Sequence, residues 1–368
     1  MNNAGWCYDK GEGVTQDKAK AFEWYLKAAN NGSAAAMNNV GLCLANGKGV
    51  VRDKAKAFEW YLKGASNGNF DAMFKIGFCY LRGKGVARDK AKAFEWFLKA
   101  ANNGNADAMN KVGLYYFNGD DGVTKDRAKA FEWFLKAANN GNAFAMNKVG
   151  LYYFNGDDGV TQDRAKAFEW FLKAANNGIV FAMNKVGWCY GNGKGVAQDK
   201  TKAFEWYLKA AEKGNVTAMF NVGCEYDNGE GVIRDKTKAF EWYLKAAENG
   251  NVTAMFNVGC EYDNGEGVEQ DKAKAFEWYL KAAEKGSEKA MTNVGLCYSK
   301  GEGVTQDKTK AFEWFQKGAN KNHPSAVYQL AECYYYGFGT PKNTTRASQL
   351  YEKAKSLGYE SSSMCAFQ

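Results

Sequence analysis

The chain has 368 residues, of which 46% are hydrophobic and 24% charged. This composition supports a large buried core and excludes a disordered chain or a small disulfide-stapled scaffold. The formal net charge of +8 is mild for this length, and lysines alternate with acidic residues, so no basic block indicates nucleic acid. A single histidine, His323, leaves no partner for a histidine-based triad or a multi-histidine metal site.

Neither an export signal nor a membrane span is visible in the sequence. The first residues, MNNAGWCYDK, contain no basic segment followed by an apolar stretch. No apolar run approaches the roughly 20 residues that cross a bilayer. We therefore expect a soluble protein of the cytoplasm.

A repeat organises the whole chain. The tryptophan of an AFEW string recurs every 36 residues, except for two gaps of 37 where NGKGV (46–50) becomes NGDDGV (118–123 and 155–160). Such loop insertions are typical of arrays of separate repeat units. These tryptophans are Trp24, Trp60, Trp96, Trp133, Trp170, Trp206, Trp242, Trp278 and Trp314. We expect ten copies, the first truncated and the last degenerate, and a C-terminal tail. Their approximate ranges are 1–32, 33–68, 69–104, 105–141, 142–178, 179–214, 215–250, 251–286, 287–322 and 323–358, with the tail at 359–368.

Each copy begins with a helix, for example at residues 106–119. At about 100° per residue, one face of this helix collects its core residues within an arc of about 140°. They are Ala108, Met109, Val112, Gly113 and Tyr116. The glycine of this set recurs in nearly every copy, although a mid-helix glycine costs about 1 kcal/mol against alanine. Its recurrence predicts that a second helix approaches too closely there for any side chain.

The second helix of each copy follows an aspartate such as Asp53, whose carboxylate can cap the first turn. In that copy it ends at Gly68, a residue suited to a left-handed helix end. We expect Glu59 and Lys63 to pair on the outer face, worth about 0.3 kcal/mol. Two adjacent apolar rows form the buried stripe: Ala57, Tyr61 and Gly64, and Phe58, Leu62 and Ala65.

The combined pattern resembles the Sel-one-like repeat, a longer-loop relative of the tetratricopeptide repeat. It reads Ala-x-x-x-Val/Leu-Gly-x-x-Tyr in the first helix and Asp-x-x-Lys-Ala-x-x-Trp-x-x-Lys-Ala-Ala-x-x-Gly in the second, as from Ala108 to Gly141. The resemblance covers essentially the whole chain. It implies an all-α fold of about ten antiparallel helix pairs in a right-handed superhelical solenoid. It also implies an adaptor or scaffold that binds other proteins, and it implies no reaction.

Partner-binding residues are expected at positions that the core does not dictate. On the first helix, the residues three before, one after and four after the recurring glycine vary most, and they share an arc beside the core face. By similarity with tetratricopeptide arrays, these positions line the groove. The candidates are Phe74, Phe78, Leu81, Asn110, Leu114, Phe117, Asn147, Leu151, Phe154, Asn184, Trp188, Phe220, Asp227, Phe256 and Asp263.

This stripe of candidates is apolar from Phe74 to Trp188 and becomes partly acidic at Asp227 and Asp263, with a glutamate two residues before each. We interpret it as a groove for an extended or helical peptide, with apolar anchors first and a basic segment toward the C-terminal half. The competing interpretation is that residues such as Leu114 only complete contacts between successive first helices.

The nine cysteines do not indicate a disulfide framework. Eight occur one per copy in first helices, and Cys365 lies in the tail. Neighbouring helix axes lie about 8–10 Å apart, whereas a disulfide needs α-carbons within about 7 Å, so we expect reduced thiols that pack between helices. Metals and cofactors are not expected: no Cys-x-x-Cys is present, and the glycine-rich acidic loops lack the ligand spacing of calcium loops.

RNA binding is the main alternative function, because arrays of helical repeats of about 35 residues each also recognise RNA, one base per repeat. Such a reader needs a basic inner surface. Here the lysines mostly lie on the second helix, and acidic residues follow along the stripe, so nucleic acid is disfavoured. A hydrolase-like activity is less favoured still, since no unique cluster of catalytic residue types interrupts the repetition. We therefore expect no enzyme activity.

Overall fold

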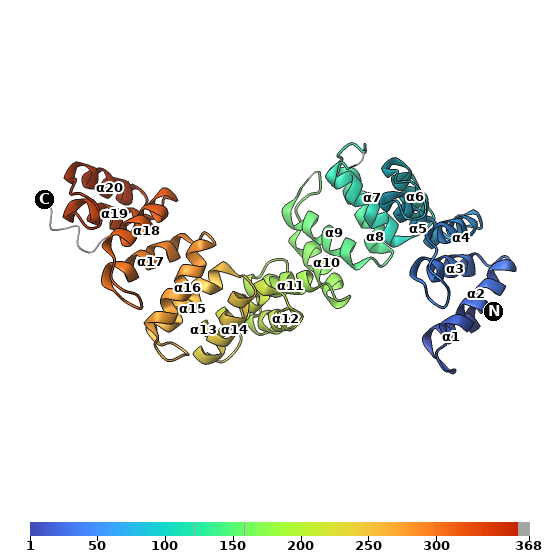
Figure 1. Ribbon diagram of the computed structural model, residues 1–368, viewed down its shortest axis with the longest axis horizontal. Helices are drawn as coiled ribbons and strands as arrows, with labels where there is room; N and C mark the ends of the chain where they lie inside the picture. The colour runs from blue at the N-terminus through green and yellow to red at the C-terminus, as the bar shows by residue number, and fades with distance from the viewer. Residues whose placement is uncertain (121, 158, 360–368) are drawn as a thin grey trace. The chain divides into compact units, whose positions relative to one another are not determined.

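The computed structural model describes residues 1–120, 122–157 and 159–359, which form twenty α-helices and no strand. The chain divides into two compact units. The first comprises residues 1–182 with 194–196, and the second comprises residues 183–193 and continues from residue 197. Within each unit the helices follow one another as pairs joined by short loops (Figure 1). The protein is the expected all-α solenoid built from ten helix pairs.

Each repeat contributes a first and a second helix. The first helices are α1 (Asn2–Lys10), α3 (Ala34–Asn46), α5 (Phe70–Arg82), α7 (Ala106–Asn118), α9 (Ala143–Asn155), α11 (Val180–Asn192), α13 (Val216–Asn228), α15 (Val252–Asn264), α17 (Glu288–Lys300) and α19 (Pro324–Tyr336). The second helices are α2 (Lys18–Asn30), α4 (Lys54–Ser66), α6 (Lys90–Asn102), α8 (Arg127–Asn139), α10 (Arg164–Asn176), α12 (Lys200–Glu212), α14 (Lys236–Glu248), α16 (Lys272–Glu284), α18 (Lys308–Asn320) and α20 (Thr344–Ser356).

Side-chain caps define the helix starts that the sequence predicts. At the start of α4, the Lys56 amide donates to Asp53 Oδ1 at 2.9 Å, which satisfies an otherwise free backbone donor. The same aspartate cap begins the second helix in the repeats from α2 to α18. First helices end at a left-handed glycine, such as Gly119 after α7 with φ of 75°. The predicted aspartate caps are therefore confirmed. The second helix α4 ends at Ser66, and the predicted left-handed glycine, Gly68 with φ of 79°, follows two residues later.

The recurring mid-helix glycine marks the closest approach of the two helices of a repeat. A Cβ built on Gly113 would lie 2.7 Å from the ring of Phe134 on α8. Equivalent glycines from Gly5 to Gly295 would place it 2.5–2.7 Å from the buried Tyr or Phe of their own second helix. Real Cβ atoms essentially never come this close, so the prediction that the second helix excludes a side chain here is confirmed.

The buried face of the first helix is wider than expected. In α7, Tyr115 is buried and Tyr116 only half-buried, whereas the helical wheel placed Tyr116 in the core. The reason is that α7 packs against second helices on both sides. Tyr115 reaches the preceding repeat, with its ring centroid 5.2 Å from Phe94 and 6.0 Å from Phe97.

Successive repeats are held together by aromatic edge-to-face pairs. Phe58 on α4 meets Tyr80 on α5 with ring centroids 5.5 Å apart at 88°. The same pair recurs at six further junctions, with centroids 5.1–5.9 Å apart. Pairs of this geometry contribute about 0.5–1.5 kcal/mol beyond the area they bury. Each repeat is thus stabilised by its neighbours, as in other solenoids.

A loop glycine adds a second junction contact. Gly85, with φ of 76°, lies against the Lys54 carbonyl at the start of the preceding second helix, so close that no Cβ fits. Six equivalent glycines make the same contact at other junctions. In the two repeats with the longer loop, a Cβ on Gly122 or Gly159 would meet no described atom within 4 Å. The two repeats with the extra loop residue therefore lack this glycine contact among the described atoms.

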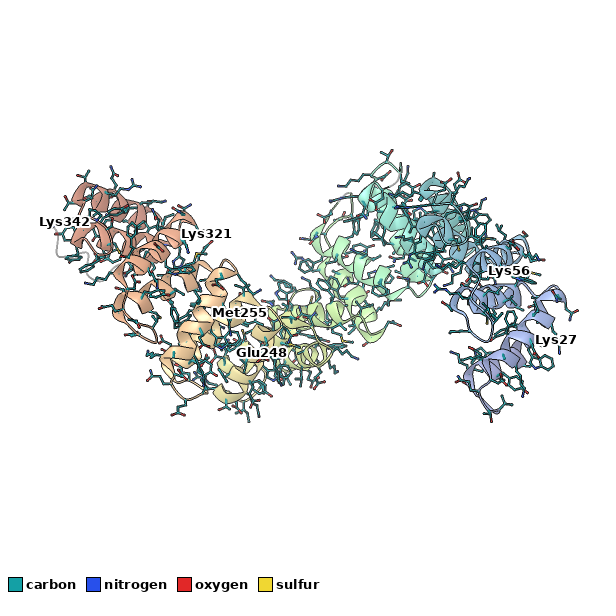
Figure 2. All side chains as sticks on the ribbon, viewed as in Figure 1. Lys27, Lys56, Glu248, Met255, Lys321 and Lys342 are labelled. Carbon is teal, nitrogen blue, oxygen red and sulfur yellow. The ribbon has the colours of Figure 1, made fainter. Side chains whose placement is uncertain are left out.

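The outer face of the second helices differs from the sequence prediction. Lys63 lies over the ring of Trp60, with Nζ 4.3 Å from the centroid, and within the described ranges it forms no ion pair with Glu59. The lysine three residues after tryptophan does the same in all nine AFEW repeats, at 3.8–5.1 Å. An exposed lysine ammonium gains little stabilisation from an ion pair with a surface carboxylate. Contact with the face of the indole ring is therefore favourable enough to replace that ion pair. Lysines such as Lys27 and Lys56 lie on this exposed face (Figure 2).

We predict that Asn105→Ala destabilises the first unit by about 1–2 kcal/mol. Asn105 is 6% exposed and caps α7 by accepting from the Ala108 amide at 2.7 Å, while its Nδ2 donates to Asp71 of the preceding repeat at 2.8 Å. Urea unfolding followed by circular dichroism checks this. Asn103→Ala, at an exposed turn between helices, should change the midpoint less, and an equal loss in both variants would contradict the capping role.

The C-terminal tail is only partly described. Tyr359 stacks on Tyr328 of α19, with centroids 4.5 Å apart at 27°. The rest of the predicted tail, residues 360–368, lies outside the described residues.

Candidate functional site

The candidate partner-binding residues all lie on first helices, in two sets that belong to separate units. All are half-buried except Asn184, which is 9% exposed. In the first unit, the set on α5, α7 and α9 is Phe74, Phe78, Leu81, Asn110, Leu114, Phe117, Asn147, Leu151 and Phe154. In the second unit, the set on α11, α13 and α15 is Asn184, Trp188, Phe220, Asp227, Phe256 and Asp263.

The aromatic candidates on α5 form a cluster above the second helix of their own repeat. Phe74 and Phe78 lie edge to face at 4.9 Å, and their centroids are 5.6 Å and 5.1 Å from the buried Phe97 on α6. One side of each ring therefore packs on the fold. Phe74 and Phe78 are both half-buried, so the rest of each ring surface is exposed to solvent.

Cationic side chains lie over the two aromatic candidates farther along the first unit. The Arg127 guanidinium is 5.2 Å from the ring centroid of Phe117, and Lys148 Nζ is 5.5 Å from the same ring. The Arg164 guanidinium is 4.0 Å from the ring of Phe154. The surface of these repeats thus combines aromatic area with positive charge.

In the second unit, Phe220 and Phe256 pack on the buried tyrosines of their own repeats, at 5.7 Å from Tyr243 and Tyr279 respectively. Asn184 accepts a hydrogen bond at 3.1 Å from Nδ2 of Asn221 in the next repeat. Its side chain therefore connects two first helices, as the competing interpretation of the stripe requires.

The two acidic candidates already hold lysines of their own repeats. Asp227 forms an ion pair with Lys236, and Asp263 pairs with Lys272 at 2.6 Å. The Tyr243 hydroxyl also donates to Asp227 at 3.4 Å. The negative charge at this position is thus balanced inside the protein. A basic partner segment at these residues stays a prediction, and it would have to compete with these lysines.

The neighbouring glutamates do not face a groove, which corrects the interpretation of the acidic stripe. Glu261 is 7% exposed and Glu225 half-buried, and in the described chain Oε2 of each is buried without a hydrogen-bond partner. Both stand two residues after the recurring glycine, where other repeats bury Cys79 or Tyr115 against the preceding second helix. Burial raises the pKa of each carboxyl to about 7.

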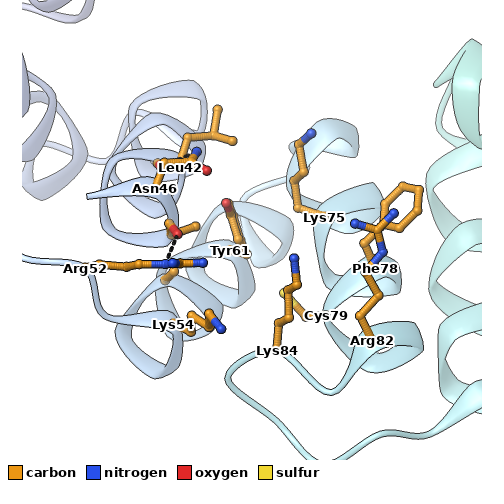
Figure 3. Close-up of a pocket in the computed structure, with 12 residues that line it drawn as sticks. Leu42, Asn46, Arg52, Lys54, Tyr61, Lys75, Phe78, Cys79, Arg82 and Lys84 are labelled. Atoms are coloured by element: carbon orange, nitrogen blue, oxygen red, sulfur yellow. Dashed lines mark hydrogen bonds between the residues drawn. The ribbon is translucent and has the colours of Figure 1, made fainter. Parts of the chain in front are cut away.

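Sequence reasoning missed a basic pocket of about 330 Å³ in the first unit (Figure 3). Its lining joins the second and third repeats and includes the candidate Phe78 together with five cationic side chains. These are Arg52, Lys54, Lys75, Arg82 and Lys84. One signal was available in the sequence, because Arg82 stands where most other repeats carry asparagine. Only the structure shows that three chain segments meet at one pocket.

In the ranges that the structure describes, no group of three or more His, Cys, Asp or Glu side chains is placed to hold a metal ion. The eight cysteines in those ranges form no disulfide, and burial raises the pKa of the Cys79 thiol to about 11. Cys365 lies outside the described residues. No helix in the described part of the chain is long and apolar enough to cross a bilayer.

Ten similar helix pairs with a constant core and variable, half-exposed first-helix residues define a helical repeat protein. A family model described as the Sel1 repeat matches ten consecutive segments. They are residues 1–33, 34–69, 70–105, 106–142, 143–179, 180–215, 216–251, 252–287, 288–323 and 324–359. The chain belongs to the Sel1 repeat family, whose members are typically non-catalytic scaffolds for protein interaction. A comparison with curated proteins gives no match.

Two solved structures support this assignment. The chain is 36% identical to c5321, described as a protective antigen of uropathogenic Escherichia coli strains that displays an SLR fold. That similarity covers 96% of this chain and 75% of the other, with a TM-score of 0.86. A Sel1 repeat protein from Oxalobacter formigenes is 29% identical over 82% of this chain and 86% of its own, with a TM-score of 0.63.

Proposed function

We propose that this protein is a non-enzymatic adaptor that binds partner proteins or peptides through the exposed parts of its first helices. The fifteen candidate residues are the contacts we assign to this role. One observation carries the proposal: three first-helix positions vary between repeats and are half-exposed in most of them, while the alanine, valine and glycine beside them are buried in nearly every repeat. Packing alone does not require this variation, since the core around it is nearly constant.

The proposal is strongest for the aromatic residues of the first unit. Phe74, Phe78, Phe117 and Phe154 expose ring surface, and arginines lie over the latter two. Aromatic rings and arginines are the groups that contribute most to binding energy at protein interfaces. A peptide with apolar side chains would bury this area in the way amphipathic segments do in other helical grooves.

We predict that Phe117→Ser combined with Phe154→Ser weakens partner binding at least about tenfold, because it removes two anchor rings. Serine suits this position, since Ser299 occupies it in the ninth repeat. The measurement is quantitative capture of partners from native lysate, followed by affinities for the purified partners. Circular dichroism verifies that the variant is folded.

The matched control replaces exposed glutamates on the second helices of the same repeats, Glu132→Ser with Glu169→Ser. Partners lost with the phenylalanine variant but kept by the control support the assignment. Equal binding by both variants and the unchanged protein would overturn it.

A further inference from the structure

The basic pocket between the second and third repeats lacks the carboxylate that two repeats of the second unit supply at the same place. Arg52 and Lys54 come from the earlier repeat, and Lys75, Arg82 and Lys84 from the later one (Figure 3). The remaining lining residues are uncharged: Leu42, Ala45, Asn46, Ala57, Tyr61, Phe78 and Cys79. Five positive charges therefore converge where no lining residue is acidic.

Nearby carboxylates are engaged elsewhere. Asp53 caps α4 and lies 3.6 Å from Lys56, and Asp89 caps α6 and lies 3.4 Å from Lys92. Asp71 accepts a hydrogen bond from the next repeat. Among the described residues, no carboxylate forms an ion pair with any of the five cationic side chains of the pocket.

The second unit shows which group fits this place. Lys200 and Glu230 occupy the positions of Lys54 and Lys84, and their side chains form an ion pair at 2.6 Å. One repeat later, Lys236 and Glu266 repeat the pair at 2.7 Å. The fold thus supplies a carboxylate against this lysine in the later repeats, whereas the pocket presents a second lysine in its place.

We propose that this pocket binds an acidic segment of a partner protein, whose glutamate or aspartate side chains take the place that Glu230 fills in the second unit. This deepens the proposed function and rests on it. A carboxylate-bearing peptide fits better than a bare anion, because apolar side chains line the pocket beside the charges. One of them, Phe78, contacts the second aromatic candidate of α5, Phe74.

The pocket would select an acidic ligand because several positive charges lie close together in it. A single exposed ion pair contributes about 0–1 kcal/mol, so one lysine would not select an acidic ligand. Five cationic groups in one pocket add their attraction, and their mutual repulsion is relieved when a multivalent anion binds. Such binding weakens with added salt, because exposed charges are screened.

The test measures fluorescence anisotropy of a fluorescein-labelled octapeptide of glutamate, with the corresponding glutamine peptide as a probe of charge dependence. The variant Lys84→Glu places a carboxylate opposite Lys54, as Glu230 stands opposite Lys200, so the fold tolerates it. We expect this variant to bind the glutamate peptide at least about tenfold more weakly than the unchanged protein. A second variant, Arg82→Asn, adopts the residue of six other repeats and should also bind more weakly.

The matched control is Lys289→Glu, the same change of charge at an exposed residue of the second unit, where Asp71 and Asp107 occupy the equivalent position. We expect its affinity to stay within about twofold of the unchanged protein. Equal losses in Lys84→Glu and Lys289→Glu would show a general charge effect and overturn the proposal. Equal binding of the glutamine peptide would do the same.

A single-stranded oligouridine is measured in parallel. If it binds more tightly than the glutamate peptide and loses affinity in Lys84→Glu, the pocket belongs to nucleic acid and the proposal is wrong. If the glutamate peptide fails to bind while Phe117→Ser with Phe154→Ser still loses its partners, only the pocket assignment is wrong. Failure of both experiments rejects the adaptor function itself.

Discussion

Replacing Gly187 by alanine is expected to destabilise the second unit by about 1–3 kcal/mol, although alanine normally stabilises a helix interior. Gly187 lies in the middle of α11, and a Cβ there would be 2.7 Å from the ring of Tyr207 and 3.1 Å from the Ala203 carbonyl. Tyr207 is 4% exposed, so its ring has no room to move aside. Thermal and urea unfolding followed by circular dichroism measure the loss.

The same helix offers a control of opposite sign. Gly191 also lies in α11, but a Cβ there would meet Ala203 at 3.5 Å and the Tyr207 hydroxyl at 3.8 Å, both ordinary contacts. Gly191→Ala should therefore stabilise by up to about 1 kcal/mol. If both alanine variants shift stability in the same direction, close helix approach does not explain the recurring glycine.

The stability of the second unit is expected to fall as the pH rises from about 5 to 8. The cause is the pair of buried carboxyls, Glu225 and Glu261, whose pKa values are raised to about 7 chiefly by burial. Glu230 raises the pKa of Glu225 further, while Lys200 opposes the shift. Around Glu261, Lys236 opposes the shift, and Asp227 and Glu266 add to it.

The sign follows from proton binding. A glutamate in the unfolded chain loses its proton near pH 4.5, whereas the folded protein keeps it until about pH 7. Between these values the folded state binds more protons, so its stability decreases with rising pH. Above pH 7 the folded state holds a buried charge. Allowing for the partial exposure of Glu225, the loss is on the order of 2 kcal/mol per carboxyl.

The variant Glu225→Gln with Glu261→Gln removes both titrating groups. We expect it to match the unchanged protein at pH 5 and to exceed its stability at pH 8. Glu205→Gln with Glu241→Gln, at exposed second-helix residues, is the control and should leave the pH profile unchanged. Measurements start at pH 5 because the aspartate caps, such as Asp235, lose their charge only at lower pH, their pKa being lowered by the backbone hydrogen bond. A flat profile for the unchanged protein would contradict the burial of these charges.

Local features of the fold could be predicted because they depend on neighbouring residues. The cap at Asp53, the left-handed glycine Gly68 after α4 and the close approach at Gly113 each follow from one helix or one helix pair. The repeats strengthened these predictions, because one sequence shows the same cap, glycine and core positions in up to ten copies.

Other features could not be predicted, because they depend on contacts between repeats. A helical wheel of α13 cannot show that Glu225 faces the preceding second helix, since that depends on the packing of two repeats. Nor does spacing show that Lys54 and Lys84, thirty positions apart, meet in one pocket with Arg82. The preference of Lys63 for Trp60 over Glu59 depends on side-chain rotamers, which the sequence pattern does not specify.

The loop glycines also bear on protein engineering. At seven junctions a glycine such as Gly85 touches the preceding helix, so foreign residues grafted into those loops would force the repeats apart. Gly122 and Gly159 have no such contact among the described atoms. We expect an epitope tag or a protease recognition sequence beside either one to be accepted with little change in melting temperature, which offers two internal attachment points for labels or surface immobilisation.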